Sequence, residues 1–392
     1  MREFPFHQVV EHGIAALSPR GVTLAMLTPL CATGPREGDA MANHVVDGAN
    51  GFVASHLIGA LVARGDTVIA LARASGEVVR RRVSDALATL HLDPAMVEKV
   101  QVRPFSLAEP GLGVSPSDVF AEPCTYWHSA ALITFFPRRE AELHAVNVAG
   151  SANTAAAFIE HAKPGSRYVH VSTAYQHGTT HGRAFEQWPE YGHPSEFRND
   201  YEHSKRLAEV ALSQTELAQG GDVLVARLGV MVGHSGTGRA LTDFGMYDFL
   251  RVIALFARRT PGERVRFVCH PRAALHLTPV DGTVDRMLAL ADGPLDRPVR
   301  HLVPPVAVRV TDLFAAISAH LPVELVAVTA ADVEAEPFGR FEAIVNMRCK
   351  FTSPYLRYEY EFESHPDAEP PPVTPRILDL LVSWYVREGL PE

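Results

Sequence analysis

A glycine-containing turn between a short apolar strand and a helix constrains the fold of this chain more than any other feature. Residues 44–47 (HVVD) predict a buried strand, and residues 48–54 follow with the pattern G-x-x-G-x-x-A. Residues 55–64 then carry apolar side chains at helical spacing. In such a unit the glycines permit a tight turn and let backbone amides approach a pyrophosphate. The pattern therefore predicts the start of a dinucleotide-binding domain.

The alternation of strands and helices continues for about 180 residues. Further strands are expected at 67–72, 100–103, 125–127, 167–171 and 223–228, and helices at 78–92, 139–161 and 201–217. Strands that alternate with helices pair in parallel, and the helices cover both faces of the sheet. The predicted fold is α/β, a Rossmann-type doubly wound parallel sheet with a smaller C-terminal substrate-binding lobe.

The regular alternation stops near Gly233, where we expect the lobe to begin. We predict an NAD(P)-binding Rossmann domain over residues 41–235 and a mixed α/β substrate-binding lobe over residues 236–392. A short strand at 265–269 and helices near Val280 and Ile377 are expected in the lobe. An aromatic and apolar cluster is expected to line its pocket, and it consists of Phe244, Met246, Tyr247 and Phe249.

Residues 1–40 precede the predicted fold. Residues 21–32 are mildly apolar and Ala-Met-Ala at 40–42 resembles a cleavage site, but the short basic start of a signal peptide is missing. Met41 lies directly before the first strand and would be a natural start. Two interpretations remain for residues 1–40: an appended arm that could bind a partner, or an artefact of the start site.

Composition excludes several classes of protein. The net charge is −9, and no basic stripe of the kind that binds nucleic acid is present. The four cysteines lie far apart, which is typical of free thiols in the cytoplasm. Neither they nor the 19 histidines have metal-ligand spacing, so no metal is expected. No run of about 18 apolar residues predicts a membrane span.

The end of the second strand bears on the choice of cofactor. An acidic residue there would bond the ribose 2′-hydroxyl of NAD, but this chain has Arg73 instead. A cation suits a 2′-phosphate, which favours NADP(H) over NAD(H). The alternative is that Arg73 is solvated, as most of the basic run at 80–82 is expected to be. The residues expected to contact the cofactor are Gly48, Asn50, Gly51, Phe52, Val53, Arg73, Ser106, Leu107, His128, Ser129, Ala130, Ser172, Tyr201, Lys205, Leu228, Gly229 and Met231.

Tyr201 and Lys205 are the candidate catalytic pair. Positions i and i+4 share one face of a helix, so both polar ends can reach one site. A neighbouring ammonium is expected to lower the pKa of the phenol and make it a usable proton donor. Thr173, at the carboxyl end of the fifth strand, is expected to hold the substrate oxygen, and Ser172 is the alternative. Each pattern also has a structural reading, namely an exposed helix pair and a hydroxyl cap.

Together these motifs resemble the extended short-chain dehydrogenase/reductase family. The branch most similar contains thioester reductase domains and fatty acyl-CoA reductases. The matching stretches lie between about residues 42 and 292 and are VVDGANGFVASHL, HSAALITFF, AVNVAGSANTA, YVHVSTAYQHG, YEHSK, ARLGVMVGHSGTGRALTDF and LTPVD.

The resemblance implies a catalytic triad of Thr173, Tyr201 and Lys205. It also implies that Lys205 bonds the nicotinamide ribose and that Asn147 has a structural role in its helix. Four positions depart from the family pattern: Asp47 before the turn, Ala54 for the third glycine, Ser106 for an aspartate, and Gly229 for a proline.

The expected reaction is reduction of an acyl thioester to an aldehyde or alcohol. The acyl group would arrive on CoA or on a separate carrier protein. The main alternative is reduction of a ketone or aldehyde on a free small molecule of secondary metabolism. A sugar-nucleotide epimerase or dehydratase, and a non-catalytic NADP-sensing protein, are further alternatives. A homodimer is considered as the assembly.

Overall fold

The computed structural model describes residues 42–179 and 182–390. The predicted arm at residues 1–40 lies outside these ranges. Within them, seven strands form one parallel sheet in the order β12-β7-β5-β4-β1-β2-β3. The strands are β1 (Asn43–Asp47), β2 (Thr67–Ala72), β3 (Gln101–Pro104), β4 (Thr125–His128), β5 (Arg167–Thr173), β7 (Val223–Leu228) and β12 (Val299–Leu302). The order steps outward in both directions from β1, which confirms the doubly wound fold.

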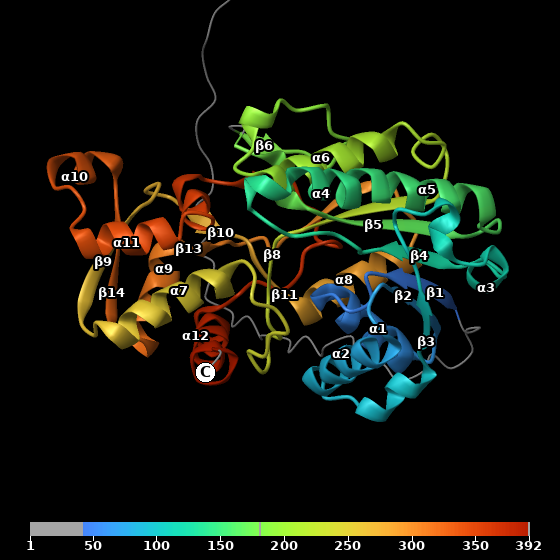
Figure 1. Cartoon of the computed structure of the whole chain (residues 1–392), viewed down its shortest axis with the longest axis horizontal. Helices are drawn as coiled ribbons and strands as arrows, with labels where there is room; N and C mark the ends of the chain where they lie inside the picture. The colour runs from blue at the N-terminus through green and yellow to red at the C-terminus, as the bar shows by residue number, and fades with distance from the viewer. Residues whose placement is uncertain (1–41, 180–181, 391–392) are drawn as a thin grey trace, which may run out of the picture.

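Helices cover both faces of this sheet (Figure 1). One face carries α1 (Phe52–Arg64), α2 (Gly76–Thr89) and α8 (Val280–Asp292). The other carries α4 (Glu140–Leu143), α5 (Gly150–His161) and α6 (Asp200–Ser213). The central strands are buried on both faces, as expected for a parallel sheet, and every residue of β7 is buried, whereas the edge strand β3 is mostly exposed.

The helix predicted over residues 139–161 is interrupted by a π-helical turn at His144–Ala149. Asn147 lies in this turn, and its side-chain amide donates to the Leu132 carbonyl and to Ser204 Oγ at 3.0 and 2.9 Å. Its Oδ1 accepts from the Leu132 amide at 2.7 Å. The extra residue in the turn aims Asn147 at the chain after β4 and at α6, a role that helical periodicity does not reveal.

A second core lies beside the sheet, on the left of Figure 1. There β9 (Glu263–Val268) pairs in parallel with β14 (Val323–Val328). Helices α7 (Met246–Arg259), α9 (Val310–His320) and α12 (Pro375–Trp384) pack around the pair, and the rings of Phe249, Phe267 and Phe314 meet at its centre. This unit is the smaller C-terminal lobe that the sequence predicts.

Short elements complete the chain. The strands are β6 (Arg183–Ala184), β8 (Val230–Val232), β10 (Ala274–Leu275), β11 (Leu277–Pro279), β13 (Val308–Arg309) and β15 (Glu361–Phe362). The short helices are η2 (Pro94–Lys99), η3 (Pro110–Gly113), α3 (Pro116–Val119), η4 (Pro137–Arg139), η6 (Ala174–His177), η7 (Pro194–Glu196), α10 (Ala330–Ala335), α11 (Arg340–Arg348), η8 (Ser353–Arg357) and η9 (Tyr385–Gly389).

The sheet extends beyond the boundary expected at residue 235. Strand β12 comes from residues 299–302 and pairs with β7, and α8 covers the sheet between the lobe's own elements. Chain that follows residue 235 therefore returns to complete the Rossmann unit.

Candidate active site

The turn between β1 and α1 has the geometry of a phosphate-binding loop. Gly48 has a φ of 63°, and a Cβ there would lie 2.7 Å from Ala130 Cα, so only glycine fits without a backbone shift. Gly51 caps α1 and has no side chain to occupy the free amides of its first turn. The positive end of the α1 dipole and these amides suit a pyrophosphate, so the turn fits a dinucleotide cofactor.

Asp47 organises the neighbouring wall of the site. Its Oδ1 accepts from the backbone amides of Ser129 and Ala130, both at 2.7 Å. Its Oδ2 accepts from Tyr126 OH at 3.2 Å and hydrogen-bonds to His128 Nδ1 at 2.7 Å. The carboxylate is fully buried. This polar residue, unusual for the family, thus shapes the chain after β4 against which the expected cofactor would lie.

Thr173 and Ser172 differ in what their hydroxyls contact. Because side chains alternate along β5, the two face opposite sides of the sheet. Ser172 Oγ donates to the buried Glu209 at 2.5 Å, and Arg227 binds the same carboxylate at 2.7 Å. Thr173 Oγ1 accepts from the Tyr175 amide at 3.2 Å and lies 3.4 Å from the Leu228 carbonyl, which accepts its proton. Because this contact is long, the Thr173 hydroxyl is freer than the Ser172 hydroxyl to bond a substrate.

Tyr201 and Lys205 both lie on α6, but their electrostatics differ from the prediction. Desolvation raises the pKa of Tyr201 above its ordinary value, and the adjacent Glu202 carboxylate adds to this rise. Lys205 donates to the Val171 carbonyl at 2.8 Å, and burial lowers its own pKa to about 8. The expected lowering of the tyrosine pKa is therefore wrong for this arrangement, because desolvation and Glu202 set the direction of the shift.

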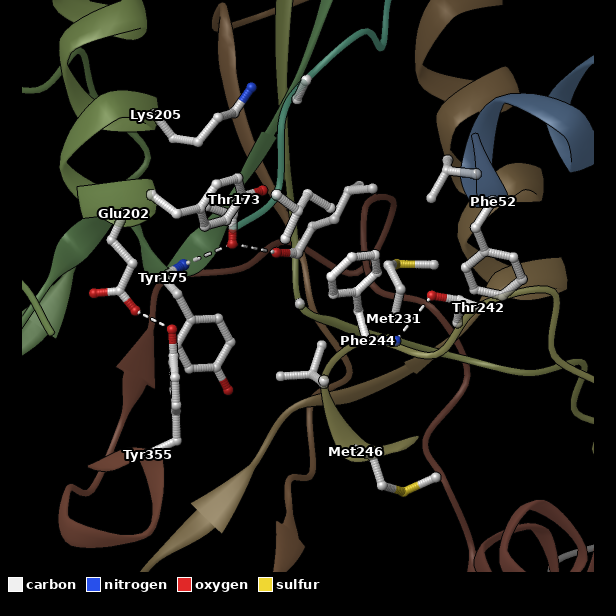
Figure 2. Close-up of a pocket in the computed structure, with 18 of the residues that line it drawn as sticks. Phe52, Thr173, Tyr175, Glu202, Lys205, Met231, Thr242, Phe244, Met246 and Tyr355 are labelled. Carbon is white, nitrogen blue, oxygen red and sulfur yellow. Dashed lines mark hydrogen bonds between the residues drawn. The ribbon is translucent and has the colours of Figure 1, made fainter. Parts of the chain in front are cut away.

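A cavity of about 310 Å³ brings most of the predicted residues together (Figure 2). Thr173 from the end of β5 and Tyr201 and Lys205 from α6 all line it. The predicted cofactor residues that also line it are Gly51, Phe52, Val53, Ser129, Ser172, Leu228, Gly229 and Met231. From the lobe, the predicted Phe244, Met246 and Phe249 reach it. Tyr247 does not, because its hydroxyl accepts from the Gly233 amide inside the lobe.

Other predicted residues lie outside this cavity. Gly48 and Asn50 belong to the turn, where Asn50 is exposed, and Ala130 offers its backbone to Asp47. Arg73 is exposed after β2. The ring of His128 is buried and both its nitrogens are bonded, one to Asp47 and one to Ser151 at 2.8 Å. That ring therefore has a packing role.

Ser106 and Leu107 follow β3. The Ser106 amide donates to the Leu112 carbonyl, and the Leu107 carbonyl accepts from Asn153 at 2.8 Å. The Leu107 side chain packs against Gly150, where a Cβ would meet it at 3.1 Å. Both residues lie at the edge where an adenine would be expected, and the contacts described here hold the protein together.

Sequence reasoning missed one wall of the cavity. Glu202, Tyr175 and Tyr355 line it next to Tyr201, and Tyr355 OH donates to Glu202 at 2.6 Å (Figure 2). Tyr355 lies about 150 residues along the chain from Glu202, so no spacing rule could pair them. Glu202 lies inside the Tyr-x-x-x-Lys motif itself, so an acidic residue next to the candidate catalytic tyrosine was the signal that the sequence offered.

Comparisons with known proteins bear on the family and on the fold. A family model described as "Male sterility protein" matches residues 46–287. The terminal R domain of the myxalamid PKS-NRPS biosynthetic pathway is 22% identical with a TM-score of 0.72, covering 92% of this chain and 95% of that one.

A thiolation-reductase di-domain from an archaeal non-ribosomal peptide synthetase is 17% identical, with a TM-score of 0.69 over 89% of this chain and 76% of that one. The UDP-glucose 4-epimerase of Bifidobacterium longum, solved with NAD+ and UDP, is 14% identical with a TM-score of 0.62 over 89% and 99%. No curated protein sequence matches the chain.

The membrane prediction can be compared with the helices directly. Among the described residues, no helix has the length and apolar character needed to cross a bilayer.

The family match covers the β1–α1 turn, the Thr173 strand end and the Tyr201–Lys205 helix. The chain therefore belongs to the male sterility protein family of extended short-chain dehydrogenase/reductases and is an NAD(P)-dependent oxidoreductase, with the same fold as the two reductase domains.

Proposed function

We propose that this protein is an NADPH-dependent reductase of acyl thioesters, presented on CoA or on a separate carrier protein, and that it yields an aldehyde or alcohol. The observation that carries the proposal is the cavity in which the Thr173 and Tyr201 hydroxyls share a wall with the start of α1. The similarity to a thiolation-reductase di-domain supports a carrier-bound substrate.

The residues divide the chemistry between them. The β1–α1 turn would hold the pyrophosphate of a nicotinamide cofactor, which would supply the hydride. Thr173 and Tyr201 would donate hydrogen bonds to the substrate oxygen and polarise the carbonyl carbon. As the carbon accepts the hydride, Tyr201 gives its proton to that oxygen. The resulting hemithioacetal then releases the thiol and leaves the aldehyde. Lys205 would hold the ribose and replenish the proton.

Arg73 supports the choice of NADPH. It stands exposed at the carboxyl end of β2, where an acid would favour NAD. Arg82, from the basic run nearby, is engaged elsewhere, because it donates to the Leu241 carbonyl. Arg73 is therefore better placed than Arg82 to bind a 2′-phosphate.

A substrate comparison with the variant Tyr201→Phe tests the proposal. Wild-type protein should oxidise NADPH with acyl-CoA and release one thiol for each aldehyde. Y201F should lower kcat by about 10²- to 10⁴-fold, the usual worth of a positioned general acid, with NADPH affinity unchanged. Measurements are absorbance at 340 nm, thiol titration and fluorescence binding. The matched control is Tyr191→Phe, an exposed tyrosine, which should behave as wild type.

Two outcomes would contradict the proposal. Reduction of ketones or free aldehydes without any turnover of thioesters would favour the small-molecule alternative. Full activity of Y201F would remove Tyr201 from the chemistry.

A further inference from the structure

Arg198 lies three residues before Tyr201 and inserts its guanidinium into a cage of aromatic rings. Its side chain is only 2% exposed. Among the described residues four tyrosines surround the guanidinium carbon, with ring centroids at 4.8, 5.0, 5.5 and 5.7 Å for Tyr355, Tyr360, Tyr358 and Tyr175. The cation therefore joins the turn after β5 to the C-terminal segment at residues 353–362.

The same guanidinium fixes the first turn of α6. Arg198 Nε donates to Glu202 Oε1 at 2.9 Å, and the Arg198 backbone amide donates to Oε2 at 3.3 Å. Glu202 is fully buried. Asn199 caps the helix by accepting from the Glu202 amide and also donates to Tyr355 OH, both at 3.0 Å. Tyr201 is held between these anchored neighbours.

A second set of contacts reaches the other hydroxyl. Arg198 Nη2 donates to the Tyr175 carbonyl at 3.4 Å, and the Tyr175 amide donates to Thr173 Oγ1 at 3.2 Å. Arg198 Nη1 donates to Tyr360 OH at 3.0 Å. One planar group thus touches the helix of Tyr201, the turn that orients Thr173 and the C-terminal segment.

We propose that Arg198 is a positioning residue that fixes the Thr173 and Tyr201 hydroxyls relative to each other and couples their spacing to residues 353–362. The inference rests on the proposed function, because that function requires both hydroxyls to bond one carbonyl oxygen. A misplacement of about 1 Å can cost about 10²-fold in rate. A lysine cannot replace the planar fork of donors or its stacking on aromatic faces.

The test compares Arg198→Lys with Arg266→Lys. Arg266 is a matched control, because its side chain is 8% exposed, pairs with Glu342 at 2.8 Å and lies 5.6 Å from the Phe338 ring centroid, all within the C-terminal lobe. R198K should lower kcat by about 10- to 100-fold, leaving the Kd for NADPH within about twofold. R266K should keep the wild-type kcat.

A milder variant guards against misfolding of R198K. Tyr360→Phe removes one acceptor of Arg198 and keeps the ring, and should lower kcat by about three- to tenfold. Thermal melting checks that each variant is folded. If R198K or Y360F is folded and has the same kcat as R266K, the inference is overturned.

A second readout separates this inference from the proposed function. If the wild type reduces no thioester, the proposed function fails. The coupling is then read from the NMR signals of the Thr173 methyl and the Tyr201 phenol carbon, assigned by substitution. R198K should shift both signals and R266K neither. An unshifted Thr173 signal in R198K would overturn the inference whatever the substrate proves to be.

Discussion

At the scale of single residues, the proposed role of Arg73 in binding a 2′-phosphate rests on its positive charge and on its position after β2. Nearby, Ser75 caps α2 by accepting from the Val78 amide at 3.4 Å, so the turn after β2 is ordered beneath it. The Arg73 side chain is exposed, which leaves it able to reach a phosphate at the end of the strand. A charge-assisted hydrogen bond there would contribute about 1.5–3 kcal/mol.

Replacement of Arg73 by alanine tests cofactor choice. The KM for NADPH should rise about 10- to 100-fold, while the KM for NADH stays the same, because NADH has no 2′-phosphate to lose a partner. Steady-state kinetics with both cofactors measure this. Arg81→Ala, an exposed arginine on α2, is the control. Equal kinetics of R73A and R81A would remove Arg73 from the phosphate site.

Ser172 and Thr173 show how far sequence can resolve a single residue. The segment Val-Ser-Thr-Ala predicted a hydroxyl at this strand end but favoured Thr173 without excluding its neighbour. The two hydroxyls differ in the structure because Ser172 bonds Glu209, which also binds Arg227 on that side of the sheet. Both lie on elements far along the chain, so the engagement of Ser172 could not be predicted.

At the scale of elements, Asp47 joins β1 to the chain that follows β4. It bonds two partly buried backbone amides and the buried side chains of Tyr126 and His128, and each of these groups would lose a hydrogen bond if it were removed. Each unsatisfied buried group costs about 1–3 kcal/mol. The strand end therefore depends on one carboxylate for its shape.

Asp47→Ala should lower the free energy of unfolding by about 3–5 kcal/mol and weaken NADPH binding, since the loss of several buried hydrogen bonds belongs to the most damaging class of substitution. Urea denaturation measures the first effect and fluorescence titration the second. Asp222→Ala is the control: its pair with Arg167 is partly exposed and worth about 0–1 kcal/mol. Equal stability of the two variants would show that Asp47 is dispensable.

Elements with a regular period could be predicted from the sequence. Strands β1, β2 and β7 and helix α1 lie within a few residues of their predicted positions, because their apolar periodicity is local. The π-helical turn at His144–Ala149 could not be predicted, since it depends on the bonds of Asn147 to Leu132 and Ser204. These partners become neighbours only when α5 and α6 pack.

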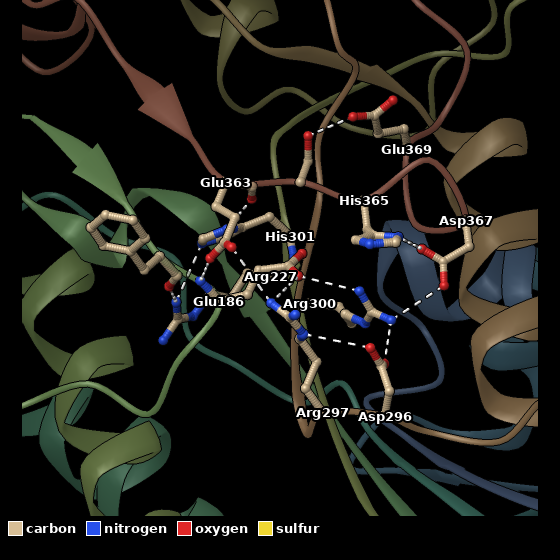
Figure 3. A network of polar contacts seen from close by, with 12 residues as sticks. Glu186, Arg227, Asp296, Arg297, Arg300, His301, Glu363, His365, Asp367 and Glu369 are labelled. Carbon is tan, nitrogen blue, oxygen red and sulfur yellow. Dashed lines mark hydrogen bonds and ion pairs between the residues drawn. The ribbon is translucent and has the colours of Figure 1, made fainter.

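At the scale of the whole molecule, a polar network ties the end of the chain to the sheet edge (Figure 3). Glu186 accepts from the His301 amide at 2.8 Å and from Arg300 at 3.3 Å. Arg300 also bonds Asp367 at 3.2 Å. Burial raises the pKa of Glu186, although the His301 amide and Arg300 oppose this rise. The network holds β12 between residues 183–187 and 363–369.

This architecture predicts that a fragment ending at residue 235 will not fold. It lacks β12 and α8, whose Val280, Val284, Met287 and Leu302 are fully buried against the Rossmann core. Each such side chain contributes about 1.5–3 kcal/mol, and a domain's net stability is only about 5–15 kcal/mol. Circular dichroism should show no cooperative melting, in contrast with the full chain. A monomeric fragment that melts cooperatively and binds NADPH would contradict this.

The sequence by itself determined the Rossmann fold, the β1–α1 turn and the candidate hydroxyls and lysine at the strand and helix ends. These features are local: glycine conformations, apolar periodicity and the i, i+4 spacing act within a few residues. The tertiary structure alone decided that Asp47 shapes the wall, that desolvation raises the pKa of Tyr201, and that Arg198 joins the two hydroxyls through Tyr175 and Glu202. Such contacts and the dielectric around them arise only when segments distant in sequence exclude water together.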